Sequence, residues 1–507
     1  MPLQKPTEVS RSALQFLGQI LHKFFIKQIY NQKLHLSNIV SLLKKNIVCV
    51  IIGADKEVEP MEQKLKKNDR IVVKIERQGA NGEGVAIHNG VVIFVPFALV
   101  GDEVLIHIIN DKNKYLIAKI IEIKKPSKKR IQPMCPYFSK CGGCDLQHIS
   151  YADQLLFKKQ LIIDTLKKYA GIETQVEDVV PSSKVFRYRN KFAFPVQEVN
   201  GEVKIGMFRK NSHQIIEIDD CMLQSERTKT IIKLFKEYMT ENKISAYNET
   251  TKTGTVKHIV VREAEEDFIM TVVVTDEKFN KFTPLVEKLK KHFSSFGLFK
   301  NVNKLNNNVI FGNLDKKIYG IYELSKNEFG VQYFVNNRSF MQVNDEIKNI
   351  IYQKILNTLG SQKNVIDAYS GAGLLSSIIS KSGTRVYGVE IVKEATENAN
   401  KLKVLNNLYN LTNKNGDCAK IIPELAKELT EGFAVVVDPP RKGLDEKVVE
   451  AFLKAEPKMI VYLSCGPSTL ARDLKKLTEK YDISFVQPYD MFPQTANVET
   501  LVCLRIR

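Results

Sequence analysis

Short apolar runs separated by helix-length segments dominate the last third of the chain. Four of these runs, NVIDAY, RVYGVE, FAVVVDPP and MIVYLSC, are rich in β-branched residues. Such alternation is typical of a parallel sheet with helices on both faces. Residues 336–507 are therefore predicted to form a Rossmann-like α/β domain, in which ligands bind beyond the carboxyl ends of the strands.

Residues 69–124 show a different pattern, in which short apolar runs alternate with polar positions. The runs are RIVVKIE, GVAIHNGVVIFVP, DEVLIHII and YLIAKIIEI, and glycines and Asn-Gly turns lie among them. Strands of this length and spacing predict a small, OB-like β-barrel over residues 61–124. Residues 125–335 mix helical and strand patterns and are predicted to form a central α+β domain. The predicted fold class is therefore multidomain α/β.

Residues 1–60 are a basic N-terminal extension with little acid before Asp55. An organellar presequence, a basic arm that contacts RNA and a translation start placed too far upstream each fit this composition. Met61 opens MEQKLKKNDRIVVKIERQG, which has the pattern of the start of a compact domain. We therefore favour the upstream start.

The whole chain is basic: it has 507 residues and a formal net charge of +18. Its length predicts about two to four domains, and its charge favours a polyanionic partner, above all nucleic acid. Eight cysteines are too few for a disulfide scaffold, and no apolar run reaches the ~18 residues of a membrane span. We expect a cytoplasmic protein with no membrane contact and no obligate protein partner.

Glycines and acidic residues follow successive strands of the C-terminal domain. DAYSGAG ends a strand in a turn, where Gly371 and Gly373 allow the backbone to approach a ligand closely. Glu390, at the end of YGVE, is placed to bind a ribose diol, and Asp417 follows a third strand within reach of an adenine edge. Together they predict a nucleoside cofactor. S-adenosylmethionine fits better than NAD, because the turn lacks the complete G-x-G-x-x-G spacing.

Candidate chemistry lies at the later strand ends. Asp438 begins DPPRKG directly after a strand, and the prolines favour a rigid loop that could hold a planar base. Cys465 ends another strand before a Gly-Pro turn and a helix, and helix N–H groups can lower the pKa of a thiol. Glu499 precedes the last apolar strand and could act as a general base. Each residue also has a structural alternative: Asp438 and the prolines would only end a strand, Cys465 would be a small buried residue, and Glu499 would be a surface acid.

The order of SFMQVN, DAYSGAG, GVE, DPPRKG, SCGPSTLARD and DMFPQTANVET resembles the RNA uracil-5-methyltransferase family, in particular the type that acts on 23S ribosomal RNA. The resemblance covers residues 61–507 and implies that the barrel is a TRAM domain and that residues 336–507 are a class I methyltransferase domain. It implies that Cys465 adds to C6 of a flipped-out uracil and that Glu499 removes the C5 proton. The residues that would hold S-adenosylmethionine are Gln342, Tyr369, Gly371, Gly373, Glu390 and Asp417. Asp438 would line this pocket or hydrogen-bond the uracil edge.

The sequence departs from the family pattern at four positions. Gly466 stands where the nucleophile motif commonly has Asn, and Gln494 and Asn497 stand where the last motif commonly has His. Leu374 stands where some relatives have a polar cofactor contact. The nucleophile and the base remain in place. A tRNA uracil methyltransferase and an inactive TRAM-containing RNA-binding protein are the alternatives to an enzyme that acts on 23S ribosomal RNA.

Three cysteines lie close together in CPYFSKCGGC, with the spacing C-x5-C-x2-C. Cys135, Cys141 and Cys144 need a fourth ligand for a metal site, and Cys221 in IDDCML is the best candidate. The spacing alone leaves zinc and an iron–sulfur cluster open. The family resemblance favours a [4Fe–4S] cluster, with zinc as the alternative, and a structural role in ordering the RNA-binding surface.

Overall fold

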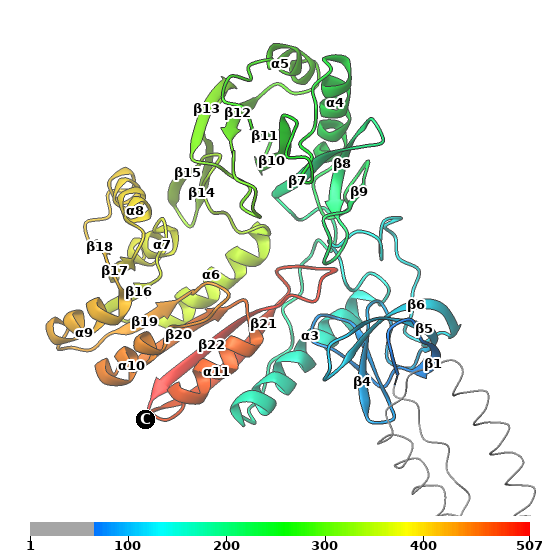
Figure 1. The fold of residues 1–507 in the computed structure, drawn as a ribbon. Helices are drawn as coiled ribbons and strands as arrows, with labels where there is room; N and C mark the ends of the chain where they lie inside the picture. The colour runs from blue at the N-terminus through cyan, green and yellow to red at the C-terminus, as the bar shows by residue number, and fades with distance from the viewer. Residues whose placement is uncertain (1–64) are drawn as a thin grey trace, which may run out of the picture. The chain divides into compact units, whose positions relative to one another are not determined.

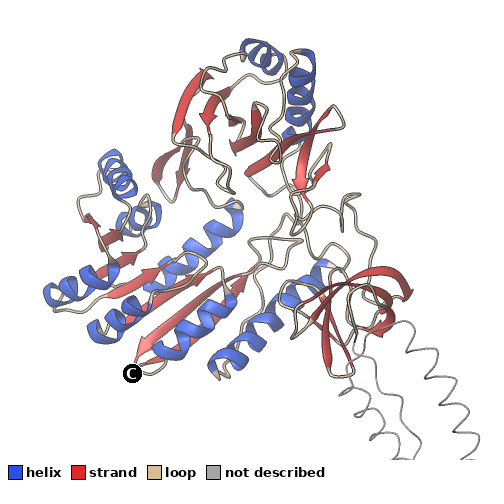
Figure 2. Cartoon of the chain, in the orientation of Figure 1, coloured by secondary structure: helices blue, strands red, loops and turns tan. Residues whose placement is uncertain are grey.

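The computed structural model describes residues 65–507, so the expectations for residues 1–60 lie outside the described part of the chain. The strands gather in three larger sheets and one hairpin, each built from a consecutive stretch of sequence (Figure 1, Figure 2). Within this range, no helix has the length and apolar character that crossing a bilayer requires.

The first sheet has six strands in the order β1-β5-β6-β4-β3-β2, and its β4–β6 pair is parallel. Val104, Ile106 and Ile108 alternate along β5 and are fully buried, as in a strand with one face on a core. The β-rich N-terminal module that the alternating pattern predicts is therefore confirmed. Its strands are β1 (Arg70–Lys74), β2 (Arg77–Gln78), β3 (Gly84–His88), β4 (Val91–Val95), β5 (Glu103–Asp111) and β6 (Leu116–Lys125).

A mixed seven-stranded sheet follows, in the order β13-β12-β11-β10-β7-β8-β9, with β11 and β12 parallel. Helices α4 (Arg227–Glu241) and α5 (Thr283–Lys290) contribute to the core of this sheet, which agrees with the predicted α+β character. The hairpin of β14 (Leu324–Glu328) and β15 (Val331–Val335) comes next. The sheet strands are β7 (Lys191–Val199), β8 (Glu202–Phe208), β9 (Ile215–Glu217), β10 (Val256–Ala264), β11 (Asp267–Val274), β12 (Phe296–Val302) and β13 (Leu314–Gly320).

The C-terminal sheet has seven strands in the order β18-β17-β16-β19-β20-β22-β21, with β22 antiparallel to both neighbours. The strand order reverses between β16 and β19, which is the point where ligands bind in sheets of this kind. The strands are β16 (Asn364–Ala368), β17 (Arg385–Glu390), β18 (Leu411–Asn415), β19 (Ala434–Val437), β20 (Met459–Ser464), β21 (Tyr481–Tyr489) and β22 (Glu499–Ile506).

Successive residues of these strands enter two different cores. Val435 and Val437 of β19 pack with α9, α10 and α11, whereas Ala434 and Val436 pack with α6 and α7. A sheet buried on both faces confirms the predicted Rossmann-like domain. The helices are α6 (Asp345–Leu359), α7 (Leu374–Lys381), α8 (Lys393–Leu405), α9 (Cys418–Glu428), α10 (Glu446–Ala455) and α11 (Pro467–Leu477).

Helix α3 (Tyr151–Thr165) and the π-helical turn η1 (Leu166–Ala170) precede the central sheet in sequence but pack on the C-terminal domain. Ile162 and Leu166 share a core with Leu474 of α11. In sequence order, the segment that packs on the C-terminal domain therefore comes before the strands of the central sheet. The expected domain boundaries at residues 124 and 335 stay predictions.

Candidate active site

The carboxyl ends of five parallel strands meet at one edge of the C-terminal sheet. Each strand carries a side chain that the sequence predicts to be functional, at its last residue or within two residues after it. The structure therefore brings these predicted residues to one edge. They are Tyr369 after β16, Glu390 at the end of β17, Asp417 after β18, Asp438 after β19 and Cys465 after β20.

Glu499 joins this edge from the antiparallel strand β22. Ser464 pairs with Thr500 in the register of β20 and β22, so Cys465, the next residue of one strand, lies beside Glu499, the preceding residue of the other. Glu499 is 5% exposed, and Cys465 is partly exposed. The predicted nucleophile and base therefore lie next to each other.

The pKa of the Cys465 thiol is raised rather than lowered. Burial is the largest cause, the carboxylates of Glu499 and Asp438 add to it, and together they raise the pKa to about 11. The Gly466 N–H, which opens the turn into α11, donates a hydrogen bond to Ser464 Oγ. The lowering that a helix N-terminus could produce is therefore outweighed, because desolvation and negative neighbours both disfavour a thiolate.

Two carboxyl groups beside this thiol also hold their protons more tightly than usual. Burial raises the pKa of Glu499 well above its ordinary value, and the charge of Asp438 adds to the effect. Burial and the charge of Asp367 raise the pKa of Asp438 to about 7. Arg441 is the positive charge that opposes these shifts at both Cys465 and Glu499. Arg441 has no predicted role in the sequence, and its place directly after the two prolines of DPPRKG is the signal that could have identified it.

The glycine turn and Glu390 lie together at this edge. The Glu390 carboxylate accepts hydrogen bonds from the Gly371 N–H (2.9 Å) and the Val392 N–H (2.8 Å). Gly371 has φ +56°, and a Cβ there would meet no atom within 4 Å, whereas a Cβ on Gly373 would lie 2.7 Å from Ala399 Cβ. Gly371 therefore leaves space that a ligand can enter, and Gly373 allows close packing between helices.

Asp417 and Tyr369 have local structural roles as well. The Asp417 carboxylate caps α9 by accepting a hydrogen bond from the Ala419 N–H, which leaves its other oxygen for a ligand. Tyr369 has φ +63°, and burial raises the pKa of its phenol. Gln342 does not follow one of the strands: it lies in the loop before α6, where its carbonyl accepts a hydrogen bond from Asn190 Nδ2 (2.9 Å).

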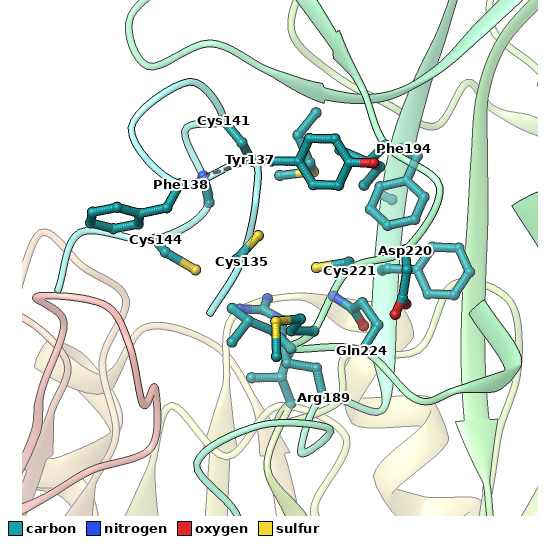
Figure 3. Close-up of a pocket in the computed structure, with 18 of the residues that line it drawn as sticks. Cys135, Tyr137, Phe138, Cys141, Cys144, Arg189, Phe194, Asp220, Cys221 and Gln224 are labelled. Carbon is teal, nitrogen blue, oxygen red and sulfur yellow. Dashed lines mark hydrogen bonds between the residues drawn. The ribbon is translucent and has the colours of Figure 1, made fainter. Parts of the chain in front are cut away.

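The four predicted cysteine ligands line a second site, a cavity of about 410 Å³. Figure 3 shows the sulfurs of Cys135, Cys144 and Cys221 directed into the same space, and Cys141 also lines it. All four are free thiols. Among residues 65–507, no three or more His, Cys, Asp or Glu side chains stand close enough together to hold one metal ion.

Two hydrogen-bond donors already face these sulfurs. Gln147 Nε2 donates to Cys144 Sγ (3.3 Å), and the Gly143 N–H donates to Cys141 Sγ (3.3 Å). Burial is the main reason why the pKa of Cys141 rises to about 11, and it also raises the pKa of Cys221. Grouped thiolates therefore need a positively charged partner in this cavity.

Comparison with known proteins decides the family. The family described as tRNA (Uracil-5-)-methyltransferase matches residues 150–507, and the TRAM domain matches residues 64–121. The chain belongs to the RNA uracil-5-methyltransferase family. The resemblance in the sequence motifs and the TRAM assignment are thus confirmed, and the uracil-5-methyltransferase match begins at Ser150, the N-cap of α3.

Relatives align with most of the chain. RNA methyltransferases of Listeria innocua and Clostridium tetani, both described as uncharacterized, are 36% and 38% identical to it. Each alignment covers 87% of this chain and 99% or 97% of the relative. The solved structure of Pyrococcus abyssi tRNA (uracil-54, C5)-methyltransferase in complex with S-adenosyl-L-homocysteine has a TM-score of 0.70 and 28% identity, over 85% of this chain and 99% of that chain.

Proposed function

We propose that this uracil-5-methyltransferase transfers a methyl group from S-adenosylmethionine to C5 of a specific uridine in 23S ribosomal RNA. The observation that carries the proposal is the adjacency of Cys465 and Glu499, which the pairing of Ser464 with Thr500 produces. A thiol nucleophile beside a buried carboxyl group suits a reaction that needs addition at C6 and proton removal at C5.

In this proposal the Cys465 thiol first loses its proton to water. The thiolate then forms a bond from Sγ to C6 of the uracil, and the C5–C6 π electrons become an enolate that makes C5 nucleophilic. C5 then forms a bond to the methyl group, whose former bond to sulfur breaks with its electron pair. The ionised form of Glu499, a stronger base because burial raises its pKa, takes the proton from C5. The C5–C6 double bond forms again as Sγ leaves C6 as a thiolate, so that atoms and electrons balance.

S-adenosylmethionine, when bound, supplies a methyl group on a positively charged sulfur. The open space at Gly371 and the free oxygen of Asp417 support a site for its adenosine part. Glu390 would bind the ribose, and Gln342, Tyr369 and Gly373 would complete the site. The pKa of the Asp438 carboxyl group is raised. A positive charge nearby would stabilise the ionised form of this group.

We also propose that Cys135, Cys141, Cys144 and Cys221 bind a [4Fe–4S] cluster. The four thiols surround a cavity, and this suits a cluster whose thiolates each bind a different iron. A single zinc ion requires four sulfurs within about 2.3 Å of one point. The donors Gln147 and Gly143 would hydrogen-bond the ligating sulfurs. The methyl transfer contains no redox step, so a structural role is proposed for the cluster.

A TRAM barrel together with a cysteine cluster resembles the ribosomal branch of the family and supports 23S ribosomal RNA as the substrate. Transfer RNA is the second candidate, because the Pyrococcus abyssi enzyme is a tRNA (uracil-54, C5)-methyltransferase that aligns with 85% of this chain. For either RNA we propose that the enzyme acts in the cytoplasm. Mapping 5-methyluridine in both RNAs from a strain without this protein decides between them: the modification should disappear from one uridine of 23S ribosomal RNA, and its loss from transfer RNA alone would contradict the proposal.

Trapping tests the chemistry itself. With S-adenosylmethionine and RNA containing 5-fluorouridine, the enzyme should form a covalent adduct. Fluorine replaces the hydrogen at C5, so there is no proton to remove and Sγ cannot leave C6. Cys465→Ala should abolish the adduct, and Cys503→Ala, a change at a buried cysteine of β22, should not. Absence of an adduct with the wild type on both ribosomal and transfer RNA would favour an RNA-binding protein without activity.

A further inference from the structure

The loop of residues 490–498 joins β21 to β22 and ends at Glu499. Its Gln494 is 4% exposed and has φ +71°. The Gln494 carbonyl accepts hydrogen bonds from the backbone N–H groups of Asp145 and Leu146, both at 3.0 Å. The first of these two residues directly follows Cys144, so the cysteine loop (residues 135–146) is bonded to the 490–498 loop.

Helix α3 also hydrogen-bonds Gln494, through the side chain of Gln154. Gln154 Nε2 donates to Gln494 Oε1 (2.9 Å), and the Gln494 N–H donates to Gln154 Oε1 (3.0 Å). Gln154 Nε2 also donates to the carbonyls of Leu146 and Ile149. The Gln154 side chain, 1% exposed, therefore joins the cysteine loop and the 490–498 loop in one network.

Asp145 makes a further contact that lies closer to the catalytic residue. Its Oδ2 accepts a hydrogen bond from the Ala496 N–H (3.2 Å), three residues before Glu499. Its Oδ1 pairs with Lys210 Nζ (2.6 Å) at the surface. These two contacts use different oxygens, so substitutions can separate the loop contact from the ion pair.

We infer that the cysteine loop positions Glu499 for proton removal. Asp145 and Gln154 are the positioning residues, because their hydrogen bonds join the cysteine loop to the 490–498 loop. The inference rests on the proposed function. Cys465 lies between β20 and α11, and none of the hydrogen bonds of Asp145 and Gln154 has its partner in either element. Displacement of the 490–498 loop should therefore slow removal of the C5 proton and leave the attack of Cys465 on C6 intact.

The two steps can be measured separately on the holoenzyme. Adduct formation with 5-fluorouridine RNA reports attack and methyl transfer, and tritium release from RNA labelled at C5 of uridine reports proton removal. In Asp145→Ala, tritium release should fall at least ~10-fold while adduct formation changes by less than ~3-fold, because small displacements of a base cost rate steeply. The covalent adduct should also accumulate on ordinary uridine RNA, with kcat lowered and KM for RNA nearly unchanged.

Two matched variants separate this role from general stabilisation. Asp145→Asn keeps an oxygen for the Ala496 N–H and should restore proton removal, and Lys210→Ala, which removes only the ion pair, should behave as wild type. Parallel loss of adduct formation and tritium release in Asp145→Ala, or no loss of either, would overturn the inference.

A second substitution keeps the inference testable if Asp145→Ala does not fold. Gln154→Met preserves the size of the side chain but removes both bonds to Gln494, so it should show the same selective loss of proton removal. Iron content is measured in every variant and should stay at the wild-type level. If the wild type itself forms no adduct and releases no tritium, the proposed function has failed; if the wild type is active and Gln154→Met shows equal loss of both steps, only the positioning role has failed.

Discussion

Lys158 Nζ lies 2.5 Å from Asp490 Oδ1, and the side chains of both residues are fully buried. The ion pair joins α3 to the first residue of the loop that leads to Glu499. Lys158 also donates to the carbonyl of Phe492 (3.1 Å). Burial lowers the pKa of Lys158, and Asp490 opposes that shift. Removal of either residue would leave the other charge buried without its ion-pair partner.

The first prediction concerns this pair. Lys158→Met should reduce the free energy of unfolding by about 3–5 kcal/mol, because it leaves an uncompensated buried carboxylate. The double variant Lys158→Met/Asp490→Leu should recover most of the loss. Urea unfolding followed by circular dichroism measures both. Lys159→Met, which removes the exposed pair with Asp178, is the control and should cost less than ~1 kcal/mol. A small loss in Lys158→Met would show that water reaches Asp490.

The strand ends of the C-terminal domain could be predicted from sequence because they depend on local pattern. The runs that end near Tyr369, Glu390, Asp438 and Cys465 are strands in the structure, and β16, β19 and β20 among them are fully buried. A parallel sheet places their carboxyl ends at one edge. The glycine-rich turn and the helix after it could be predicted for the same reason. Gly373 has a positive φ, and α7 starts directly after it.

The contacts of α3 could not be predicted in this way. Gln154 and Lys158 are polar residues on a helix, and their pattern indicates an exposed face. They are buried because their partners, Gln494 and Asp490, lie more than 300 residues later. The pKa of Cys465 was unpredictable for the same reason, because it depends on the burial and charge that Glu499 and Asp438 produce in three dimensions.

The second prediction concerns Glu499 and pH. Its pKa in the folded state is raised by burial, so the stability that Glu499 contributes is fully present below its pKa in the unfolded chain and is lost as pH rises toward its folded pKa. Glu499→Gln cannot lose a proton there. The variant should have a higher Tm than the wild type at pH 8, with a smaller difference at pH 5, and should lose ~10²–10⁴-fold in methylation rate. An equal Tm difference at both pH values would show that Glu499 is ionised in the folded protein.

The third prediction concerns the reactivity of Cys465 in the free enzyme. Because its pKa is about 11, alkylation by iodoacetamide should accelerate about tenfold per pH unit between pH 7 and pH 9, in proportion to the thiolate. Peptide mass spectrometry measures Cys465 alone. Asp438→Asn removes a negative neighbour and should speed alkylation at pH 8, whereas Arg441→Gln should slow it. A rate that is already constant above pH 7 would mean a thiol with a low pKa.

The fourth prediction concerns the cysteine cavity. On the proposed [4Fe–4S] assignment, Cys221→Ala removes one of the four thiols that line the cavity, so the purified protein should lose most of its iron and acid-labile sulfide and the visible absorption of the proposed cluster. The control is Cys418→Ala, at a buried cysteine in the core of the C-terminal domain, which should keep both. Unchanged iron and sulfide in Cys221→Ala would contradict the assignment of the fourth ligand, and zinc in place of iron in the wild type would favour the alternative metal.

The fifth prediction separates two glycines of one turn. A Cβ on Gly373 would lie 2.7 Å from Ala399 Cβ, at φ +82°, whereas a Cβ on Gly371 would enter open space at φ +56°. Gly373→Ala should therefore lower the free energy of unfolding by about 2 kcal/mol or more, through both strain and overpacking between α7 and α8.

Gly371→Ala carries only the backbone strain of about 1 kcal/mol, but its methyl group would occupy space proposed for the cofactor. Calorimetry with S-adenosylhomocysteine should show at least ~10-fold weaker binding to Gly371→Ala, since ~1.4 kcal/mol of lost contact corresponds to that factor. Wild-type affinity in this variant would place the cofactor elsewhere.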